Sequence, residues 1–412
     1  MPEFVADFHI HSRYSRATSK DLTVDELAKW AKLKGVGVLG TGDFTHPLWL
    51  QELQEALRPA GAGLFTHDGA TFMLTTEVNT LYYKDGRAHQ IHHLLLAPSF
   101  EAVERINREL EAFGSLMQDG RPMLKMEAWR LVELVRGVEP RAAVIPAHIW
   151  TPHFSVFGSN SGFDTLEACF ESQTPHIFAL ETGLSSDPAM NWRLSALDRF
   201  ALISNSDSHS ARRIGREANI FRCELTYDAI LQALKTRDPE QFLSTIEFFP
   251  EEGKYHLDGH RACGVRWTPS ETRAHDARCT VCGKKVTVGV LHRVEALADR
   301  PEGATRPRAT PFTRVVPLDE IIAEAMKMGV GTQTVEREYQ QLVYKFGTEF
   351  DVLLKTPLEA LREGADGRIV EGIARMREGR LHVEPGYDGE YGVVRMFDEV
   401  AAPAGGEQMT LF

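Results

Sequence analysis

The sequence lacks a segment that is long and apolar enough to cross a membrane, and it has few cysteines for its length. Its longest uninterrupted apolar runs are far shorter than a bilayer requires. The first residues, Met1-Pro2-Glu3, lack the basic-then-apolar pattern of a signal peptide. The five cysteines among 412 residues indicate metal ligation and buried thiols rather than a disulfide framework. We therefore expect a cytoplasmic protein that has no membrane partner.

The chain also lacks an excess of basic residues. It has 46 Lys and Arg against 58 Asp and Glu, which gives a formal net charge of -12. This charge excludes a generally basic nucleic-acid coat, but a local basic groove and bound divalent metals remain compatible with it. The hydrophobic fraction of 43% and the length of 412 residues are enough for two or three domains, each with its own core.

Residues 1–245 alternate strand-like runs with helical stretches, which is the pattern of βα repeats. One example is a helix expected over 24–34, which has Thr23 before it, an acidic first turn and Gly35 as its stop. Six or more such units end in His, Asp or Glu. This pattern predicts an α/β fold, a (β/α) barrel that is one unit short or distorted.

Three further regions follow this barrel. Residues 246–298 hold three of the five cysteines and are expected to form a small zinc-binding module. Residues 299–400 begin with a linker and return to helical patterns over 318–328, 334–344 and 368–378, which predicts a helical C-terminal domain. Residues 401–412 have the composition of a flexible tail.

Histidines and carboxylates recur at the ends of the strand-like runs. His9 and His11 follow the run 4–8, and two imidazoles at i and i+2 on a strand point to the same face. The other residues in this placement are Asp43, His46, Glu77, His92, His93, His148, Asp207 and His209. Imidazole and carboxylate are ligands for zinc, manganese or iron, and bridging carboxylates hold two metals close together. The recurrence predicts one multinuclear metal site.

A second metal pattern lies in the cysteine-rich region. His260 and Cys263 form an HxxC pair, and Cys279 and Cys282 form a CxxC pair. Two such turns separated by a loop are typical of a zinc knuckle. Four protein ligands would hold one structural zinc, which folds the module and carries no chemistry. The alternatives to His260 as the fourth ligand are His256, His275 and His292.

Three segments, 7–11, 42–46 and 206–209, resemble the motifs of the PHP (polymerase and histidinol phosphatase) superfamily. This resemblance implies a distorted (β/α)7 barrel with two or three divalent metals, which could be zinc, manganese, magnesium or iron. The ligands it implies are His9, His11, Glu77, His93, His148, Asp207 and His209, together with Asp43 or His46. His92 and His93 are neighbours on one strand and face opposite ways, so either one could be the ligand. We expect His9, Glu77 and Asp207 to carry the catalysis.

Within this superfamily, the segments 9–20, 40–47, 255–261, 289–295 and 384–392 resemble the endonuclease Q family. The resemblance covers nearly the whole chain and implies a nucleoid-associated repair enzyme. Such an enzyme cuts double-stranded DNA on the 5′ side of a deaminated base (uracil, hypoxanthine or xanthine) or of an abasic site. Clustered metals supply what phosphodiester hydrolysis needs, and reading a lesion within a duplex requires a flipped-out nucleotide.

Several polar residues near the predicted metal site are candidates for DNA contacts. Asn79 and Asn205, close in sequence to Glu77 and Asp207, could donate to the carbonyl that deamination creates. Arg212, Arg213 and Arg216 could contact phosphates. At the chain end, Gln408, Leu411 and Phe412 resemble the QxxLF peptide by which bacterial repair proteins bind the DNA sliding clamp.

Two other functions are compatible with part of this pattern. A PHP phosphoesterase acting on a small-molecule phosphate ester would use the same metal site, but it would leave the zinc module, the helical region and the tail without a purpose. A non-catalytic protein that binds DNA lesions or the clamp would need no intact ligand set. The complete set of predicted ligands therefore favours the nuclease.

Overall fold

The structure, a computed structural model, describes residues 1–397. The predicted clamp peptide with Gln408, Leu411 and Phe412 lies outside the described residues. Within residues 1–397, no helix is both long enough and apolar enough to span a membrane.

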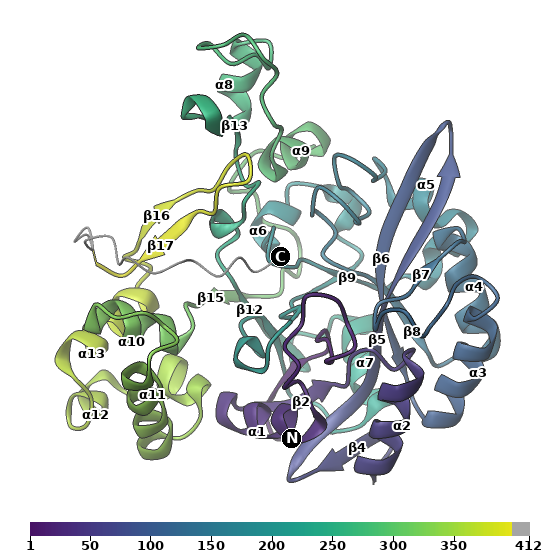
Figure 1. Ribbon diagram of the computed structural model, residues 1–412, viewed down its shortest axis with the longest axis horizontal. Coiled ribbons are helices and arrows are strands. Elements are labelled where there is room, and N and C mark those ends of the chain that lie inside the picture. Colours follow the sequence, from purple (N-terminus) through teal and green to yellow (C-terminus); the bar gives the residue numbers. More distant parts are fainter. Residues whose placement is uncertain (398–412) are drawn as a thin grey trace.

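A sheet of 11 strands forms the centre of the N-terminal part (Figure 1). Its main path runs through β15 (Phe312–Arg314), β12 (Phe242–Glu247), β11 (Ala218–Phe221), β1 (Phe4–Asp7), β2 (Val36–Gly40), β5 (Ala70–Lys84), β4 (Leu64–His67) and β3 (Arg58–Gly61). Two strands, β6 (Arg87–Ala97) and β7 (Met123–Leu124), pair with β5, and β8 (Ala143–Pro146) pairs with β6. A separate parallel pair is formed by β9 (Ala179–Glu181) and β10 (Ala201–Ile203).

The strand directions explain why the barrel is distorted. β1, β2 and β5 run parallel, as βα repeats require, whereas β6 and β11 run antiparallel to β5 and β1. The long antiparallel β5–β6 hairpin, which projects beyond the sheet in Figure 1, interrupts this parallel order. The expected α/β fold with a distorted barrel is confirmed.

Helices cover the outside of this sheet. They are α1 (Val24–Lys34), α2 (Pro47–Ala56), α3 (Phe100–Leu110), α4 (Ala128–Val138), α5 (Leu166–Phe170), α6 (Pro188–Asn191) and α7 (Tyr227–Thr236). The helix predicted over 24–34 is present because Thr23 accepts a hydrogen bond from the Glu26 N–H at 3.3 Å and Gly35 ends it at φ 87°. Beneath the helices, apolar side chains such as Phe8, Met73 and Ile145 are fully buried.

The cysteine-rich segment forms a small unit that projects from the rest of the molecule in Figure 1. It contains β13 (Asp258–His260), β14 (Val265–Trp267) and α8 (Pro269–Ala274), and α9 (Val290–Leu297) follows it. Its buried apolar cluster is limited to Val265, Cys279 and Val286. A core this small does not hold a fold by itself, which is consistent with stabilisation by a metal ion.

The C-terminal helices pack against the barrel. They are α10 (Leu318–Met326), α11 (Gln333–Phe346), α12 (Leu358–Arg362) and α13 (Gly367–Arg377), and the hairpin of β16 (His382–Glu384) and β17 (Val393–Arg395) follows them. A buried ion pair of 2.6 Å between Lys34 and Glu349 and a ring contact of Trp30 with Tyr339 join α1 to this region. Since β15 lies after residue 299 and still pairs with β12, the domain boundaries remain a prediction.

Candidate functional site

The end of β1 is tied to the loop after β10 by one buried carboxylate. Asp7 accepts hydrogen bonds from the N–H groups of Ser206 at 3.1 Å and Gly215 at 3.0 Å. Beyond Asp7, the His11 N–H donates to the Ser208 carbonyl at 2.9 Å. These bonds bring His9 and His11 next to Asp207, although nearly 200 positions separate them in the sequence.

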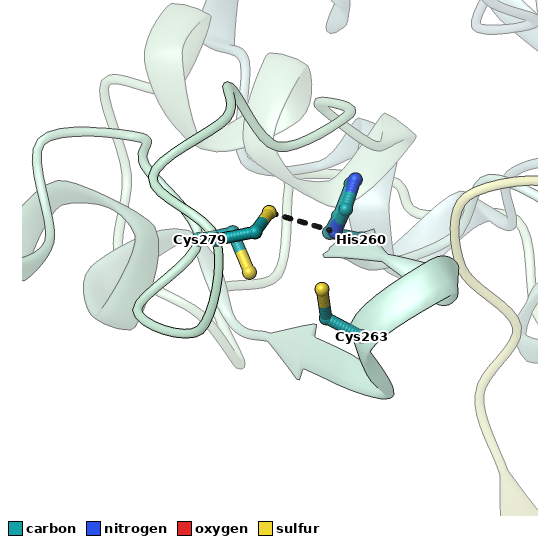
Figure 2. A group of neighbouring side chains, drawn as sticks. His260, Cys263 and Cys279 are labelled. Atoms are coloured by element: carbon teal, nitrogen blue, oxygen red, sulfur yellow. Dashed lines mark hydrogen bonds between the residues drawn. The ribbon is translucent and has the colours of Figure 1, made fainter.

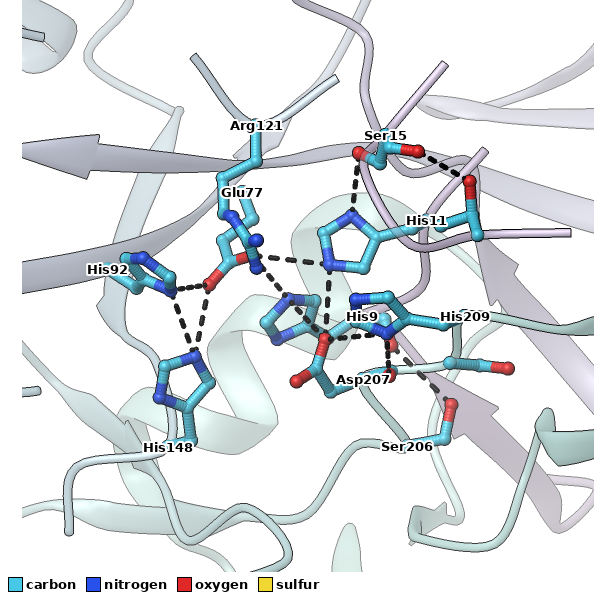
Figure 3. Close-up of polar contacts among 12 residues, drawn as sticks. His9, His11, Ser15, Glu77, His92, Arg121, His148, Ser206, Asp207 and His209 are labelled. Atoms are coloured by element: carbon cyan, nitrogen blue, oxygen red, sulfur yellow. Dashed lines mark hydrogen bonds and ion pairs between the residues drawn. The ribbon is translucent and has the colours of Figure 1, made fainter. Parts of the chain in front are cut away.

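A first group of four donors consists of His9, His11, Glu77 and Asp207, whose ligand atoms all lie within 4.8 Å of one another (Figure 3). His11 Nε2 is 3.2 Å from Glu77 Oε2 and 3.1 Å from Asp207 Oδ1. His9 Nε2 is 3.5 Å from the same Glu77 oxygen. Two imidazoles and two carboxylates at these separations are a suitable donor set for a divalent transition metal.

A second group uses the other oxygen of the same glutamate. Glu77 Oε1 lies 2.6 Å from His92 Nδ1 and 3.0 Å from His148 Nε2 (Figure 3). Glu77 comes from β5, His92 from β6, and His148 follows β8. Because each Glu77 oxygen faces a different group of histidines, this carboxylate belongs to both groups of possible metal ligands.

Further side chains orient the imidazoles. His9 Nδ1–H donates to Glu181, whose two oxygens lie 3.0 Å away, and His11 Nδ1–H donates to Asp43 at 3.0 Å. His148 Nδ1 lies 3.0 Å from Thr151 Oγ1. In each case Nε2 is turned toward the donor groups, which is how metal-binding histidines are usually held.

Two properties of the site indicate that it is built for cations. His9 Nε2 is buried and has no hydrogen-bond partner among the described residues. Burial alone would raise the pKa of Glu77, but His92, Arg121 and His9 hold that pKa well below its usual range. Burial would lower the pKa of His9, yet Glu181, Glu77 and Asp207 raise it well above its usual value. The carboxylates therefore create a strongly negative, buried site that suits divalent ions.

The backbone at this site is strained. Asp43, His148 and Asp207 have φ angles of 47°, 30° and 45°, in the left-handed region that non-glycine residues rarely adopt. Such strain persists only where surrounding contacts hold the residue in place, and it concentrates at functional sites.

His93 does not reach the cluster. Residues 92 and 93 of β6 lie opposite Asn79 and Val78 of β5, so His93 faces away from Glu77. Its Nε2 lies 2.9 Å from Thr80 Oγ1, and burial lowers the pKa of His93 to about 3. Of the two neighbours that the sequence left as alternatives, the structure brings His92 to Glu77.

Asp43 and His46, the other pair of alternative ligands, also have different surroundings. Asp43 accepts from His11 Nδ1 and from the Ser12 N–H at 2.7 Å, so it supports a donor without joining the two groups. His46 bonds the Met117 carbonyl at 3.1 Å and stacks on Tyr14. His209 lies beside His11, with ring centroids 4.6 Å apart, at the edge of the first group.

Some of the candidates for DNA contacts are buried or already paired, and others line a cavity. Asn205 is fully buried and donates to Glu181 at 2.7 Å, so it cannot reach a base. Arg212 pairs with Glu336, and Arg213 pairs with Glu320 at 2.5 Å, so both join the barrel to the C-terminal helices. Of these five residues, Asn79 lines one open cavity, and Arg213 and Arg216 both line another.

Sequence reasoning missed Arg121 and Glu181 as members of the site. Arg121 lies in a loop before β7 and contacts Glu77 Oε2 at 3.1 Å, and no periodicity marks it. Glu181 ends β9, so its position at a strand end was a usable signal.

Two cavities flank the donor groups. The amide cavity, of about 320 Å³, is lined by Asn79, Gln90, Gln118, His92, Arg121 and Phe154, among others. The aromatic cavity, of about 400 Å³, is lined by Asp207, His209, Arg216, Phe248 and Tyr391, among others. They share no lining residue, and each touches one of the two donor groups, so the candidate metal centre lies between them.

The cysteine-rich module has its own donor group. His260, Cys263, Cys279 and Cys282 place their ligand atoms within 4.8 Å of one another (Figure 2). Cys282 Sγ lies 3.7 Å from His260 Nδ1. Of the alternative fourth ligands, His292 bonds Asp258 at 2.6 Å and His275 stacks on Trp267. Four converging N and S donors fit a closed, tetrahedral zinc site.

Comparisons with known proteins find several relatives of this chain. The family model described as "MJ0043 C-terminal domain" matches residues 317–380. The uncharacterized protein YqxK of Bacillus subtilis is 29% identical over 416 residues, covering 96% of this chain and 100% of that protein. The uncharacterized protein MJ0043 of Methanocaldococcus jannaschii is 29% identical over 253 residues, 60% of this chain and 31% of that protein.

Two solved structures are similar over almost the whole chain. One is the lesion-specific endonuclease PfuEndoQ from Pyrococcus furiosus, with 31% identity, a TM-score of 0.85 and coverage of 97% of this chain and 96% of that chain. The other is endonuclease Q in complex with a 27-mer duplex substrate with an abasic lesion at the active site. It has 30% identity, a TM-score of 0.84 and coverage of 99% of this chain and 100% of that chain.

Proposed function

The chain belongs to the endonuclease Q family of lesion-specific DNA endonucleases, and we propose that it cuts duplex DNA on the 5′ side of a deaminated base or an abasic site. The observation that carries this proposal is Glu77, whose two oxygens face separate groups of buried donors, with a cavity beside each group. A bridged metal pair is the arrangement that in-line hydrolysis of a phosphodiester uses.

The first group, with His9, His11 and Asp207, would hold one metal, and the second group, with His92 and His148, would hold another. Glu77 would bridge them, and His209, whose ring lies beside that of His11, would help to hold a third. Two or three divalent ions held by these donors supply the activated water and the positive charge that phosphodiester hydrolysis requires. Arg121, which is both at Glu77 and in the wall of the amide cavity, is placed to neutralise a phosphate oxygen.

The amide cavity is the proposed pocket for the flipped-out lesion. Deamination replaces an amino group by a carbonyl and adds an N–H to the ring, so a pocket that selects such bases needs donors and acceptors together. Asn79, Gln90 and Gln118 supply amides, and the buried Asn79 Oδ1 has no hydrogen-bond partner among residues 1–397. Phe154 stacks on His92 at 5.0 Å with 40% of its surface exposed, and it offers a face to a base.

A comparison of substrates tests this pocket separately from the metal centre. We expect Asn79→Leu to slow nicking of uracil- and hypoxanthine-containing duplexes about 10- to 100-fold, because a buried polar contact is worth about 1–3 kcal/mol. Nicking at an abasic site should change less than about threefold, since no base is read there. Equal losses on all three substrates would contradict the assignment of the pocket.

The C-terminal peptide with Gln408, Leu411 and Phe412 supports a second proposed contact, with the DNA sliding clamp. A second contact on the same chain raises the effective concentration of the enzyme at the clamp and so adds avidity on DNA. Deleting residues 408–412 should abolish clamp pulldown and leave nicking of short duplexes unchanged. Unchanged pulldown would remove this contact.

A further inference from the structure

The aromatic cavity is not the proposed lesion pocket, yet it lies at the same metal centre. Its wall includes Asp207 and His209, three residues after β12 (Phe248, Glu252 and Gly253), and Tyr391 from the loop before β17. The amide cavity lies at His92, on the other side of Glu77. A phosphodiester held between the two donor groups would therefore have one cavity for each of the nucleotides that it joins.

Two arginines line this cavity, Arg213 and Arg216, and Arg213 is paired with Glu320, which leaves Arg216 as the cation that could meet an anion. Its Nε–H donates to the Ser206 carbonyl at 3.0 Å, and its guanidinium lies 6.0 Å from the centre of the Phe248 ring. Among residues 1–397, no carboxylate lies within ion-pairing distance of Arg216, whereas its neighbours Arg212 and Arg213 are both paired. One edge of this guanidinium is therefore fixed, and the rest of its donors are available for an anion.

The two glutamates in the same wall do not cancel this charge. Glu320 is already paired with Arg213 at 2.5 Å. Burial raises the pKa of Glu252 to about 8, so this side chain is largely neutral at pH 7. Lys254 lies 4.5 Å above the Tyr391 ring and adds positive charge at the rim. The cavity as a whole suits a phosphate.

The remaining wall suits a base of any identity. Phe248, Tyr391 and Leu184 offer aromatic and aliphatic surface, and the described lining contains no Asn or Gln. Stacking on aromatic rings tolerates every base, whereas amides read the edge of a particular one. This composition is the opposite of the amide cavity, where three amides gather.

We propose that the aromatic cavity binds the undamaged nucleotide immediately 5′ to the cut, with Arg216 on the phosphate at the 5′ side of that nucleotide and Phe248 and Tyr391 against its base. This inference rests on the proposed function, because it assumes a cut on the 5′ side of the lesion. The enzyme would then hold two consecutive nucleotides, reading the identity of only one.

The test is a double-mutant cycle that combines a substitution at Arg216 with a modification of one DNA phosphate. The readout is nicking of a short duplex that carries one abasic site. A methylphosphonate, which removes one phosphate charge, replaces the phosphate one step 5′ of the cut. Charge-assisted hydrogen bonds are worth about 1.5–3 kcal/mol, so Arg216→Met and the methylphosphonate should each lower kcat/KM about 10- to 100-fold. When both changes are present, kcat/KM should fall no more than about threefold below its value with either change alone.

Controls separate this effect from damage to the metal centre. A methylphosphonate four phosphates farther 5′ should act independently of Arg216→Met, and Arg222→Met, on the surface with Glu3, should behave as the parent chain. Arg216→Lys should restore part of the loss on unmodified DNA. If the losses from Arg216→Met and from the methylphosphonate nearest the cut multiply, the inference is wrong. The proposed function would still stand in that case, as long as the parent chain nicks the duplex. If the parent chain nicks no lesion-containing duplex, the proposed function fails first.

Discussion

Glu181 tests whether the orientation of His9 matters to the metal centre. This carboxylate is fully buried and accepts from His9 Nδ1–H, from the His148 N–H at 2.8 Å and from Asn205 at 2.7 Å. Glu181→Gln keeps the volume and one acceptor oxygen, but it removes the charge and points an NH₂ group at donors. Loss of such a partner usually weakens metal binding 10- to 100-fold, or about 1.4–2.8 kcal/mol.

The assay is a Mn²⁺ titration of metal-free protein, followed both by calorimetry and by nicking of an abasic duplex. We expect the midpoint to rise about 10- to 100-fold, with a nicking rate at saturating metal that falls much less. Glu240→Gln, an exposed glutamate, is the matched control. A midpoint within threefold of the parent value, in a variant that still folds, would refute the reasoning.

Three further predictions follow from the same contacts. His92→Ala should remove about one equivalent of metal and lower nicking more than 100-fold. His93→Ala should keep the metal content and mainly lower the melting temperature. If metal analysis shows the reverse, the roles assigned to the two histidines are exchanged. Cys282→Ser should release the structural zinc and expose 258–288 to proteolysis, and an unchanged zinc content would remove the site. Burial raises the pKa of Glu247 from 4.5 to about 8, so the folded state favours its protonated form and loses stability as the pH rises from about 4.5 to 8. Glu247→Gln should therefore raise the melting temperature more at pH 8 than at pH 5.5, and an equal shift at both pH values would contradict this.

Much of the metal centre could be predicted because strand geometry is regular. His9 and His11 share a face just beyond β1, and Asp207 follows β10, so these residues meet where strand ends gather at one edge. Glu77 joins them from the middle of β5, not from a strand end as the sequence predicted. The choice between His92 and His93 depended on the register of β6 against β5, which a run of apolar residues does not fix.

The residues that could not be predicted act through long-range packing. Arg121 reaches Glu77 from an irregular loop, which has no period to detect. Arg212 and Arg213 looked like phosphate contacts, but the C-terminal helices place Glu336 and Glu320 against them. Only the docking of those helices on the barrel decides which arginine of the run remains available, and that docking has no local signal in the sequence.

The most direct test of the central claim is the product of one reaction. The protein, with Mn²⁺, Mg²⁺ or Zn²⁺, is incubated with duplexes labelled on one strand that carry a single uracil, hypoxanthine or abasic site, and the fragments are sized at single-nucleotide resolution. We predict a metal-dependent nick at the phosphodiester 5′ to the lesion, no nick in the undamaged duplex, and no product from Asp207→Asn. Hydrolysis of phosphomonoesters without any nick in DNA, or lesion binding without cleavage at every metal concentration, would contradict the account.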